Sequence, residues 1–385
     1  MIVICEPQCK GLEHIMVNSA LIIMIKHIFP YEKILFIAEM NHIKNIKEII
    51  DNDVIDIEYK SIIIPPRYQS SLWRFSLELK IARDVFTFAS NSNIDKVLFC
   101  SITSPGLISI KLLLKSFKRI KCMIIPHAIL ESIYRPPLKV TELLFWFRIW
   151  ISIDNSEKLH YILLSPCIKN ELIKQLPHLN NYISAIDLPY IYKNINSKSL
   201  ECKDNIIKFG FFGVGSYSKG IEAFFDLAKN IKEHKSKLNA KFILVGRISN
   251  AIERKLNNGY VQILSIDKPL SDADFMRYSA EIDYAIFLHN YKRYRLSASG
   301  SIFDALSNLT PIIALNNPQF KYFFDKLGDI GYLCDDAKDI ELVILNLLNN
   351  MSTERYLVQS SNLARAKDEF DIKKIGKKIR PFWGN

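Results

Sequence analysis

The sequence lacks several features that would assign it to a familiar class. Its seven cysteines are scattered, with no Cys-x-x-Cys pair and no histidines at zinc-site spacing. No apolar stretch reaches the roughly 20 uncharged residues of a membrane-spanning helix, and the N-terminus meets Glu6 before a signal sequence could form. These absences disfavour a disulfide-rich secreted domain, a zinc module and an integral membrane protein, and we expect free thiols in a reducing cytoplasm.

A nucleic-acid-binding motif is also missing, although the chain is basic. Lys and Arg number 51 against 40 Asp and Glu, a formal net charge of +11. This excess favours an anionic partner such as a nucleotide phosphate or a lipid head group, and it equally serves solubility. Because no recognised motif or aromatic platform accompanies the charge, we expect no nucleic-acid partner.

What the sequence does contain is an alternation of apolar runs and helical stretches over 385 residues, enough for about two or three domains. Continuous apolar runs predict parallel strands that are covered on both faces. The expected strands are 2–5, 34–38, 96–101, 121–126, 161–164, 206–212, 241–246, 260–264, 284–288 and 311–315. The clearest expected helices are 17–28, 219–231, 271–282, 301–306 and 340–349, the last one preceding a basic tail.

The alternation is interrupted over 187–205, where proline, tyrosine and serine replace the periodic pattern. We therefore expect an N-terminal domain over 1–188, a linker over 189–205 and a C-terminal domain over 206–365. A basic tail over 366–385 is expected to pack back on the N-terminal domain. The predicted fold class is α/β, with two doubly wound Rossmann-like domains facing a central cleft.

The sharpest local signal is a glycine-rich turn after the strand at 206–212. Gly213 and Gly215 would let the backbone approach a ligand, and the helix start that follows favours an anion. Lys219 would add a positive charge for a phosphate. The missing third glycine disfavours the dinucleotide fingerprint of a dehydrogenase, and a purely structural turn stays open as an alternative.

A second signal is a segment in which arginines precede a serine-rich helix start. It comes just after the strand that leads to His289. Hydroxyl groups and backbone N–H groups at that start, with the arginines before it, would suit a diphosphate. The alternative is a serine N-cap with solvated arginines. The residues of this segment are Arg293, Arg295, Ser299, Gly300, Ser301 and Asp304.

These two motifs occur in one succession together with a strand that ends in Val245-Gly246 and with Thr310-Pro311. This succession resembles the C-terminal domain of GT-B glycosyltransferases. It is most similar to the large retaining family that includes many bacterial cell-surface polysaccharide enzymes. The resemblance covers about 206–336 well and the N-terminal half only in outline. It implies that Lys219 binds the diphosphate. The family also has an Arg where this chain has Val214.

The same resemblance places the second of two family glutamates on Asp304, while the first falls on Leu296 and is missing. The residues expected on the nucleotide-sugar side are Gly213, Gly215, Lys219, Gly246, Arg247, His289, Arg293, Arg295, Ser299, Gly300, Ser301 and Asp304. No metal and no cofactor are expected, since the Asp-x-Asp triplets at Asp51 and Asp272 arise readily by chance.

In the N-terminal half, the segment from Gly11 through Glu13 to His14 resembles the glycine-rich loop that GT-B enzymes place near the acceptor and the transferred sugar. His127 follows an apolar strand, at the sheet edge that binds ligands in this architecture. Histidine suits proton transfer near neutral pH, so His127 is the catalytic candidate. The alternative is a hydrogen-bonded loop histidine.

The aromatic stretch 143–150, with Arg135 and Lys139 upstream, suits either a membrane interface or a buried core helix. The resemblance implies sugar transfer, with retention, from a nucleotide-sugar to a glycan or lipid-linked acceptor in bacterial O-antigen or capsule synthesis. The expected location is the cytoplasm, with peripheral contact to the anionic inner face of the plasma membrane. A non-catalytic GT-B-like protein that binds nucleotide or glycan is the alternative.

Overall fold

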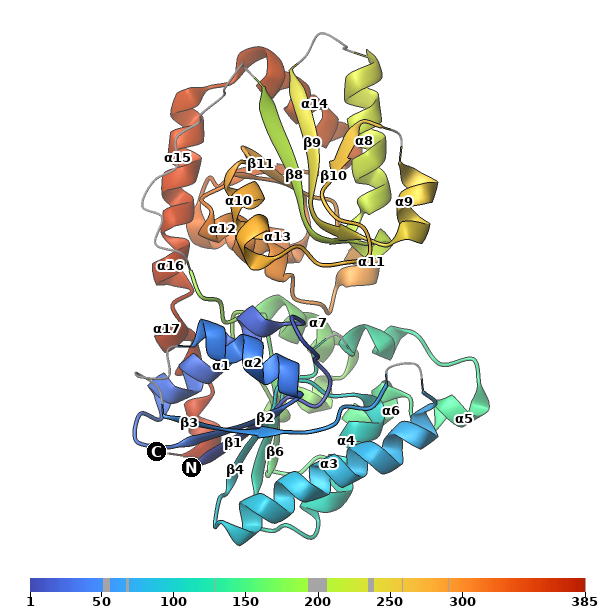
Figure 1. Cartoon of the computed structure of the whole chain (residues 1–385), viewed down its shortest axis with the longest axis vertical. Coiled ribbons are helices and arrows are strands. Elements are labelled where there is room, and N and C mark those ends of the chain that lie inside the picture. The colour runs from blue at the N-terminus through green and yellow to red at the C-terminus, as the bar shows by residue number, and fades with distance from the viewer. Residues whose placement is uncertain are drawn as a thin grey trace. The chain divides into compact units, whose positions relative to one another are not determined.

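The structure, a computed structural model, describes residues 1–50, 56–66, 69–127, 129–192, 206–234, 239–257, 259–289 and 291–384, except the side chains of His234 and Arg293. The chain forms two compact units (Figure 1). Unit 1 comprises Met1–Ile191, Leu296–Ala298 and Phe370–Asn385, and unit 2 comprises Tyr192–Arg295 and Ser299–Glu369. Most of the predicted linker, 193–205, lies outside the described residues.

Unit 1 contains a seven-stranded parallel sheet in the order β3-β2-β1-β4-β5-β6-β7. Its central strands form because their apolar, largely β-branched runs are buried on both faces. The strands are β1 (Ile2–Cys5), β2 (Ile34–Ala38), β3 (Ile57–Ser61), β4 (Lys96–Phe99), β5 (Lys121–Ile124), β6 (Leu159–Leu163) and β7 (Ile183–Ala185).

Helices cover this sheet, and the C-terminal segment of the chain is among them. Trp383 donates its indole N–H to the carbonyl of Lys121 at 3.2 Å, and a Cβ on Gly376 would lie 2.7 Å from Met24 Cγ. Residues 370–384 therefore pack within unit 1. The helices of unit 1 are α1 (Ile15–Ile28), α2 (Met40–Ile49), α3 (Ser71–Asn91), α4 (Ser104–Leu114), α5 (Val140–Leu143), α6 (Phe147–Ser152), α7 (Pro166–Gln175), α17 (Ile372–Gly376) and α18 (Arg380–Trp383), with the 3-10 turns η1 (Leu130–Tyr134) and η2 (Pro177–Tyr182).

Unit 2 repeats the design with a six-stranded parallel sheet in the order β10-β9-β8-β11-β12-β13. The strands are β8 (Ile207–Gly215), β9 (Ala240–Ile248), β10 (Val261–Ile263), β11 (Tyr284–Phe287), β12 (Ile312–Leu315) and β13 (Gly331–Cys334). The helical elements are η4 (Tyr217–Lys219), α8 (Ile221–His234), α9 (Asn250–Leu256), α10 (Asp272–Ala280), α11 (Tyr291–Tyr294), α12 (Gly300–Ser307), α13 (Pro318–Leu327), α14 (Ala337–Asn350), α15 (Thr353–Ala364) and α16 (Ala366–Glu369).

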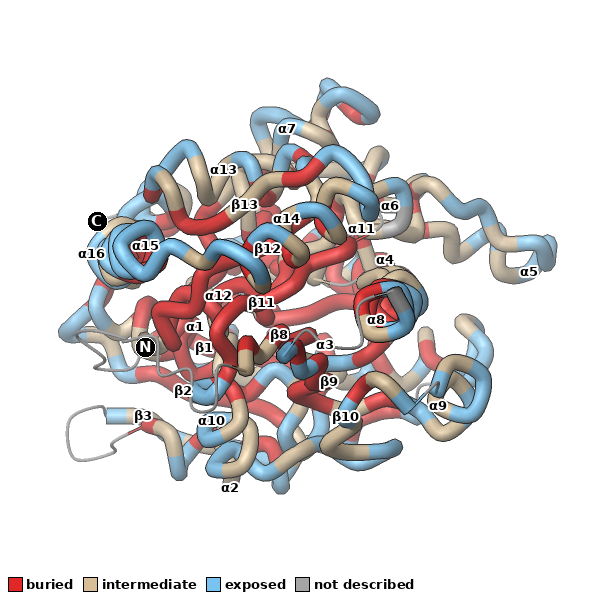
Figure 2. The backbone as a smooth tube through the Cα atoms, turned by 90° about the horizontal axis from the view of Figure 1, so that it is seen from above, coloured by how far each residue is buried: buried red, intermediate tan, exposed pale blue. Residues whose placement is uncertain are grey.

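The predicted fold class is confirmed: each unit is a doubly wound parallel sheet. The strands of both sheets are largely buried (Figure 2), whereas helices such as α8 and α15 have one buried and one exposed face. In each unit the strand order reverses at one point, beside β1 and β4 in unit 1 and beside β8 and β11 in unit 2. Open α/β sheets bind ligands at the carboxyl ends of strands at such a point.

The prediction of a last helix at 340–349 followed only by a tail is wrong, because α15 and three short helices follow α14. Apolar periodicity missed α15 because part of its buried face is polar. Gln359 donates to Asp329 Oδ1 at 2.9 Å, and Ser360 Oγ donates to the carbonyl of Leu309 at 3.1 Å. Strands β3, β7 and β13 were also not predicted; β3 alternates polar residues at the sheet edge, and β7 is only three residues long.

Candidate functional site

In unit 2, two glycines bring the ends of β8 and β9 into close approach. Gly213 lies in register with Gly246, and a Cβ on Gly246 would lie 1.9 Å from the carbonyl oxygen of Gly213. Both have positive φ, 89° at Gly213 and 155° at Gly246, where a side chain would be strained. The requirement for glycine at the carboxyl ends of these strands is therefore steric.

The side chain of Lys219 reaches Gly213, one of the two glycines. The turn before α8 passes close to the end of β11, and glycine at position 220, with φ 81°, allows this approach. A Cβ on Gly220 would lie only 2.1 Å from the carbonyl oxygen of Leu288. The Nζ of Lys219 is then 3.4 Å from where a Cβ on Gly213 would be. Burial lowers the pKa of Lys219, and the carboxylate of Asp304 partly opposes this shift. Lys219 is thus a partly desolvated cation.

The start of α12 lies beside the same glycine, because Ser301 Cβ is 3.8 Å from the position of a Gly213 Cβ. Ser299 precedes this helix as its N-cap but makes no side-chain capping bond. Its hydroxyl lies instead 2.8 Å from Ser301 Oγ and 3.4 Å from His289 Nε2. The two hydroxyl groups and the free N–H groups of the first turn of α12 form a set of donors next to Lys219.

His289 completes this cluster from the end of β11. It is 5% exposed and packs against the rings of Phe287, Tyr294 and Phe320. Burial, and then the nearby charge of Lys219, lower the pKa of His289 to about 3, so the imidazole is neutral at pH 7. Among the described atoms its Nδ1 is buried without a hydrogen-bond partner. A buried polar atom in that state is uncommon in folded proteins and calls for an explanation, such as a partner on a bound ligand.

The cluster formed by Gly213, Lys219, His289, Ser299, Ser301 and Asp304, here called the unit 2 cluster, is suited to an anion. It combines a cation, hydroxyl donors, a helix start and glycines that expose backbone. These are the elements that hold the phosphates of nucleotides in doubly wound folds.

The structure gives the other residues predicted for the nucleotide-sugar side the following surroundings. Gly215 packs against Ile221 and Ile248, which is a structural role. Arg247, at the end of β9, donates to the carbonyl of Asp267 at 3.4 Å. Arg295 places its guanidinium 6.0 Å from the ring centre of Tyr291, and the Gly300 Cα faces open space. The side chain of Arg293 lies outside the described residues.

In unit 1, a buried carboxylate shapes the loop after β1. Glu6 is 1% exposed and its Oε1 accepts from the backbone N–H of Gln8 at 2.8 Å, from that of Cys9 at 3.1 Å and from Ser101 Oγ. Its Oε2 accepts from Asn18 on α1 at 3.2 Å. Sequence reasoning missed this residue, although an acid directly after a buried strand was a usable signal.

A second missed residue, His42 on α2, holds the glycine of the same loop. Its Nδ1 lies 2.9 Å from the carbonyl oxygen of Gly11, and its Nε2 lies 3.0 Å from Asn18 Nδ2. Because a carbonyl only accepts, the proton is on Nδ1 and Asn18 donates to Nε2. The loop is fixed further by Glu39, which accepts from the backbone N–H of Gly11 at 3.2 Å.

This loop brings together two histidines that the sequence analysis singled out separately. His14, with φ 52° at the N-cap of α1, meets His127 edge to face, with ring centres 4.5 Å apart. A positive φ at a non-glycine residue is strained and is typical of functional loops. Burial, and then His14, lower the pKa of His127 to about 3. Glu13 accepts from the backbone N–H of Lys10 at 3.1 Å within the loop.

Leu296 lies in the same part of unit 1. It is 1% exposed in the core, its backbone N–H donates to Glu131 Oε1 at 2.5 Å, and it borders a small hollow that His127 and Ala298 also line. The position at which the resemblance places a glutamate therefore carries a buried apolar side chain near His127.

The aromatic stretch that could have been a membrane interface is largely tied into unit 1. Trp146 donates its indole N–H to the carbonyl of Ser132 at 2.8 Å, and Trp150 donates to that of Leu144 at 2.6 Å. Phe147 lies in the core. Within the described residues, no helix is both long and apolar enough to cross a membrane.

Comparison with known proteins gives a match in structure and none in sequence. No protein-family model and no curated protein matches the chain. HepE of Anabaena, solved with UDP and glucose, is 15% identical with a TM-score of 0.63 and 98% of each chain covered. WaaG, a glycosyltransferase involved in lipopolysaccharide biosynthesis, is 9% identical with a TM-score of 0.62 and the same coverage. Sucrose-phosphate synthase of Thermosynechococcus elongatus is 12% identical with a TM-score of 0.65, covering 98% of this chain and 97% of that one.

These similarities extend over nearly the whole chain. With the two parallel sheets, they show that this chain has the GT-B glycosyltransferase fold. At this level of identity they show the fold and not the reaction.

Proposed function

We propose that the protein is a nucleotide-sugar-dependent glycosyltransferase, and that the unit 2 cluster binds the diphosphate of the donor. The arrangement of Lys219 over Gly213, beside the start of α12, carries this proposal. A diphosphate there would accept hydrogen bonds from the free N–H groups of α12 and from Ser299 and Ser301, and would pair with Lys219. HepE, of the same fold, was solved with UDP and glucose.

The proposed reaction keeps the anomeric configuration of the sugar. With a pKa of about 3, His127 is too weak a base to accept the acceptor's proton efficiently at pH 7. In a retaining transfer the departing phosphate can take that proton, and His127 then only has to orient the donor sugar by hydrogen bonding. The neutral imidazole of His127, held against His14, suits that task.

The proposed acceptor is a glycan or a lipid-linked sugar in the assembly of a bacterial surface polysaccharide. Its support is the fold shared with WaaG, which is involved in lipopolysaccharide biosynthesis. The basic balance of the chain, +11, is compatible with work at an anionic membrane surface.

A second candidate function, a non-catalytic protein that binds nucleotide or glycan, is favoured by two positions. Val214 stands where the resembling family has an arginine, and Leu296 stands where it has a glutamate. Val214 is 44% exposed and Leu296 is buried, so neither position supplies a charge.

Binding and turnover separate the two candidates. Thermal stabilisation should first be screened over a panel of nucleotide sugars, with Lys219→Ala as the negative control. The donor that stabilises the protein is then incubated with an acceptor extract, and the anomeric configuration of the product is read by NMR. A retained product supports the first proposal and an inverted one contradicts retention. Binding without transfer to any acceptor supports the second candidate.

A further inference from the structure

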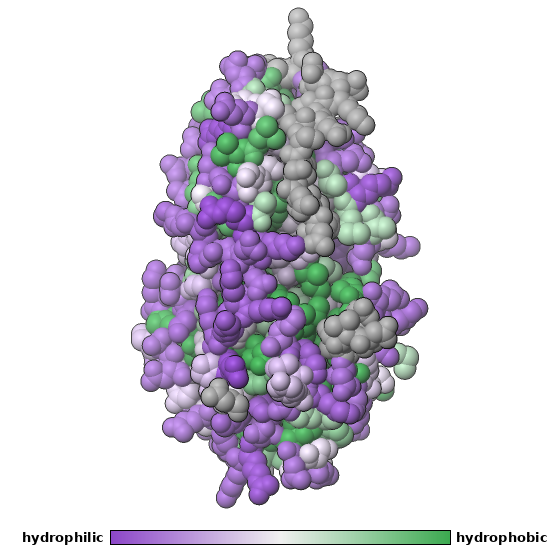
Figure 3. Space-filling model, turned by 90° about the vertical axis from the view of Figure 1, so that its left-hand side faces the viewer, coloured by the Kyte–Doolittle hydropathy of each residue, from purple (hydrophilic) through white to green (hydrophobic). Residues whose placement is uncertain are grey.

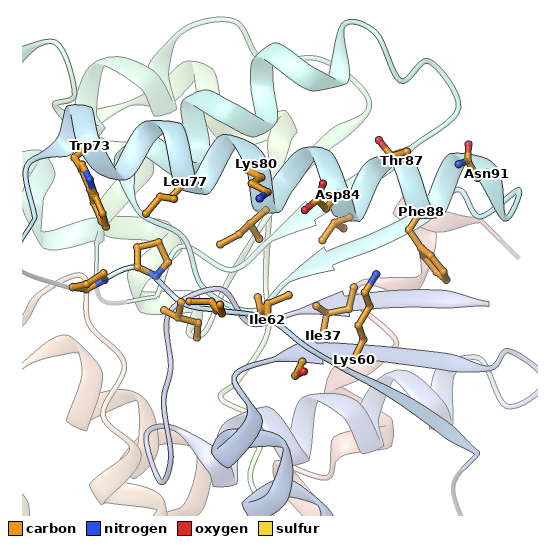
Figure 4. Close-up of a pocket in the computed structure, with 17 residues that line it drawn as sticks. Ile37, Lys60, Ile62, Trp73, Leu77, Lys80, Asp84, Thr87, Phe88 and Asn91 are labelled. Carbon is orange, nitrogen blue, oxygen red and sulfur yellow. The ribbon is translucent and has the colours of Figure 1, made fainter.

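Unit 1 contains an elongated apolar groove that the proposed reaction does not use. Its volume is about 690 Å³, and it lies between α3 on one side and β3 with the segment 62–66 on the other (Figure 4). Its walls are mainly apolar and include Ile62, Pro65, Trp73, Leu77, Ile81 and Phe88. The groove forms because β3 is the edge strand of the sheet, so α3 has no further strand to pack on there.

The groove has the shape of a chain-binding site. Its lining residues on α3 run from Trp73 to Asn91, which is about 27 Å along the helix axis at the usual rise per residue. In Figure 4 the side chains of Trp73 and Phe88 project from α3 near the two ends of this run. A long, narrow and apolar groove fits an extended hydrocarbon chain better than a compact polar metabolite.

At the Trp73 end the groove meets an exposed apolar face. Ile63 and Leu72 are 92% and 71% exposed. The start of α3 is joined there to α5, since Glu142 accepts from the backbone N–H of Ser71 at 3.2 Å and from its hydroxyl.

The helix α5 buries none of its residues and lies at the periphery (Figure 2). Leu138, just before it, is 102% exposed, and Val140 and Leu144 are 81% and 70% exposed. Ile63, Leu72, Trp73, Leu138, Val140 and Leu144 are called the apolar face. Large apolar side chains gathered in this way usually mark an interaction site.

Positive charge accompanies both the groove and the apolar face. Lys60 and Lys80 line the groove, and the Lys60 ammonium lies 5.3 Å from the ring centre of Phe88. Arg135 and Lys139 are exposed beside Leu138 and make no ion pair within the part of the chain that the structure describes. Among the described residues that line the groove, Asp84 is the one acid. The excess of cations matches an anionic head group.

From these observations we propose that the apolar face docks on an anionic bilayer and that the groove takes up one hydrocarbon chain of a bilayer lipid. The exposed leucines and valine enter the interface, Arg135 and Lys139 meet the head groups, and the lipid chain lies along α3 between Trp73 and Phe88. The apolar face takes the place of Trp146 and Trp150 as the surface expected to contact the membrane, because the indole N–H groups of these two residues donate hydrogen bonds within the protein. The inference concerns where the protein works, so it stands independently of the proposed transfer reaction.

Flotation with vesicles tests the apolar face. The protein should bind phosphatidylcholine vesicles that contain phosphatidylglycerol, bind pure phosphatidylcholine vesicles much less, and dissociate as salt is added. Leu138→Glu or Val140→Glu should lower the partition at least about tenfold, because each removes the insertion of one apolar side chain. The matched control is Val358→Glu, at a half-exposed position on α15. Figure 3 shows the side of the molecule on which α15 lies in Figure 1, where hydrophilic side chains predominate.

Quenching tests the groove. Because Trp73 also belongs to the apolar face, the probe is a tryptophan at the other end of the groove, in the variant Phe88→Trp. Vesicle lipids with bromine on the acyl chains should quench the tryptophan fluorescence of bound Phe88→Trp protein more than that of bound wild type. Quenching no greater than in wild type would overturn the groove assignment.

Wild-type protein that ignores anionic vesicles, or Leu138→Glu protein that binds as well as wild type, would overturn the docking surface. A dimer in vesicle-free solution that Leu138→Glu dissociates would also overturn it, in favour of a second copy of this chain. Affinity for the nucleotide sugar should be the same in all these variants, so failure here leaves the proposed transfer reaction standing.

Discussion

The two units share one sheet topology, yet they place opposite kinds of chemistry at the point where strand order reverses. In unit 2 the end of β8 holds glycines, a buried lysine and a helix start, a cluster that is charged and rich in backbone donors. In unit 1 the end of β1 leads into a loop fixed by Glu6 and His42, and His14 of this loop contacts His127, which follows β5 and stays neutral.

This difference follows from what each edge is proposed to bind. A phosphate is recognised by backbone N–H groups and a cation, which need glycine and close approach. A sugar hydroxyl both donates and accepts hydrogen bonds, so it is recognised by side chains held at fixed angles, and a net positive charge is not required. The predictions below test this contrast, starting with the largest expected effect.

Introducing a charge next to the neutral edge of unit 1 should be the most damaging change. Leu296→Glu would place a carboxylate in the core beside Glu131, which already accepts from the backbone of residue 296. A buried charge without a partner costs about 3–5 kcal/mol. We expect a loss of that size in the free energy of unfolding of unit 1. Urea titration followed by tryptophan fluorescence measures it, since Trp73, Trp146, Trp150 and Trp383 all belong to unit 1.

The matched control is Leu296→Met, which keeps volume and polarity and should cost less than about 1.5 kcal/mol. A stable Leu296→Glu protein with improved turnover would show that this position can still carry the missing glutamate. The contrast between the two units would then be weaker than proposed.

Removing the charge from unit 2 should weaken donor binding without unfolding the protein. Lys219→Ala takes away the charge-assisted contact to the diphosphate, for which we expect a loss of about 1–3 kcal/mol, or roughly 5- to 150-fold in Kd. Titration calorimetry with the nucleotide sugar measures the loss. Lys229→Ala, at an exposed position on α8, is the control and should bind the donor as wild type does. Unchanged donor affinity in Lys219→Ala would remove the unit 2 cluster from the site.

His127→Ala should lower turnover by a smaller free energy than Lys219→Ala takes from donor binding. The reason is that, in the proposed reaction, His127 orients the sugar and does not take a proton. Loss of one neutral hydrogen bond costs about 1 kcal/mol, so turnover should fall roughly five- to tenfold, with little change in donor affinity. The control is His178→Ala at an exposed position. A fall of about 10²–10⁴-fold would instead indicate a general base and an inverting reaction. Steady-state kinetics with product NMR distinguishes these outcomes.

The contrast between the units also explains what could be predicted from sequence. Gly213, Lys219 and Ser299 could be singled out because phosphate binding needs these residue types at short, ordered spacing. Glu6 was missed although its place directly after β1 was a usable signal, whereas His42 could not be singled out, because it acts through a hydrogen bond to a loop that is distant from it in the sequence. His14 and His127 were each proposed, but their contact depends on the order of strands in the sheet.

The fold class was predictable because buried parallel strands are continuous apolar runs, as in β1 and β2. Elements that bury polar side chains, or that are only partly buried, were not predictable in this way. The edge strand β3 carries Glu58 and Lys60, and α15 buries Gln359 and Ser360. The groove beside β3 was missed for the same reason: it arises from an absent neighbouring strand, which no local pattern records.

The smallest expected effect concerns the pH dependence of unit 1 stability, and His160 is the clearest probe of it. This residue lies on β6, where its Nε2 is 2.8 Å from Ser184 Oγ and its ring stacks on Phe382 at 4.8 Å. Burial, and then Lys169, lower its pKa to about 4. The unfolded chain, with an ordinary pKa of about 6.5, binds more protons than the folded one between those values, so stability falls as pH drops through that range.

For one such histidine, linkage lowers the free energy of unfolding by about 0.7 kcal/mol between pH 7 and pH 6 and by about 1.2 kcal/mol between pH 6 and pH 5. His127 adds to the slope in the same direction. His160→Gln retains a hydrogen-bonding group for Ser184 but cannot titrate, so its urea midpoint should depend less steeply on pH than that of wild type. His178→Gln, exposed to solvent, is the control. If His160→Gln keeps the wild-type slope, the pKa of His160 is the same in the folded and unfolded protein, and the lowered pKa argued for the buried histidines of unit 1 loses its independent support.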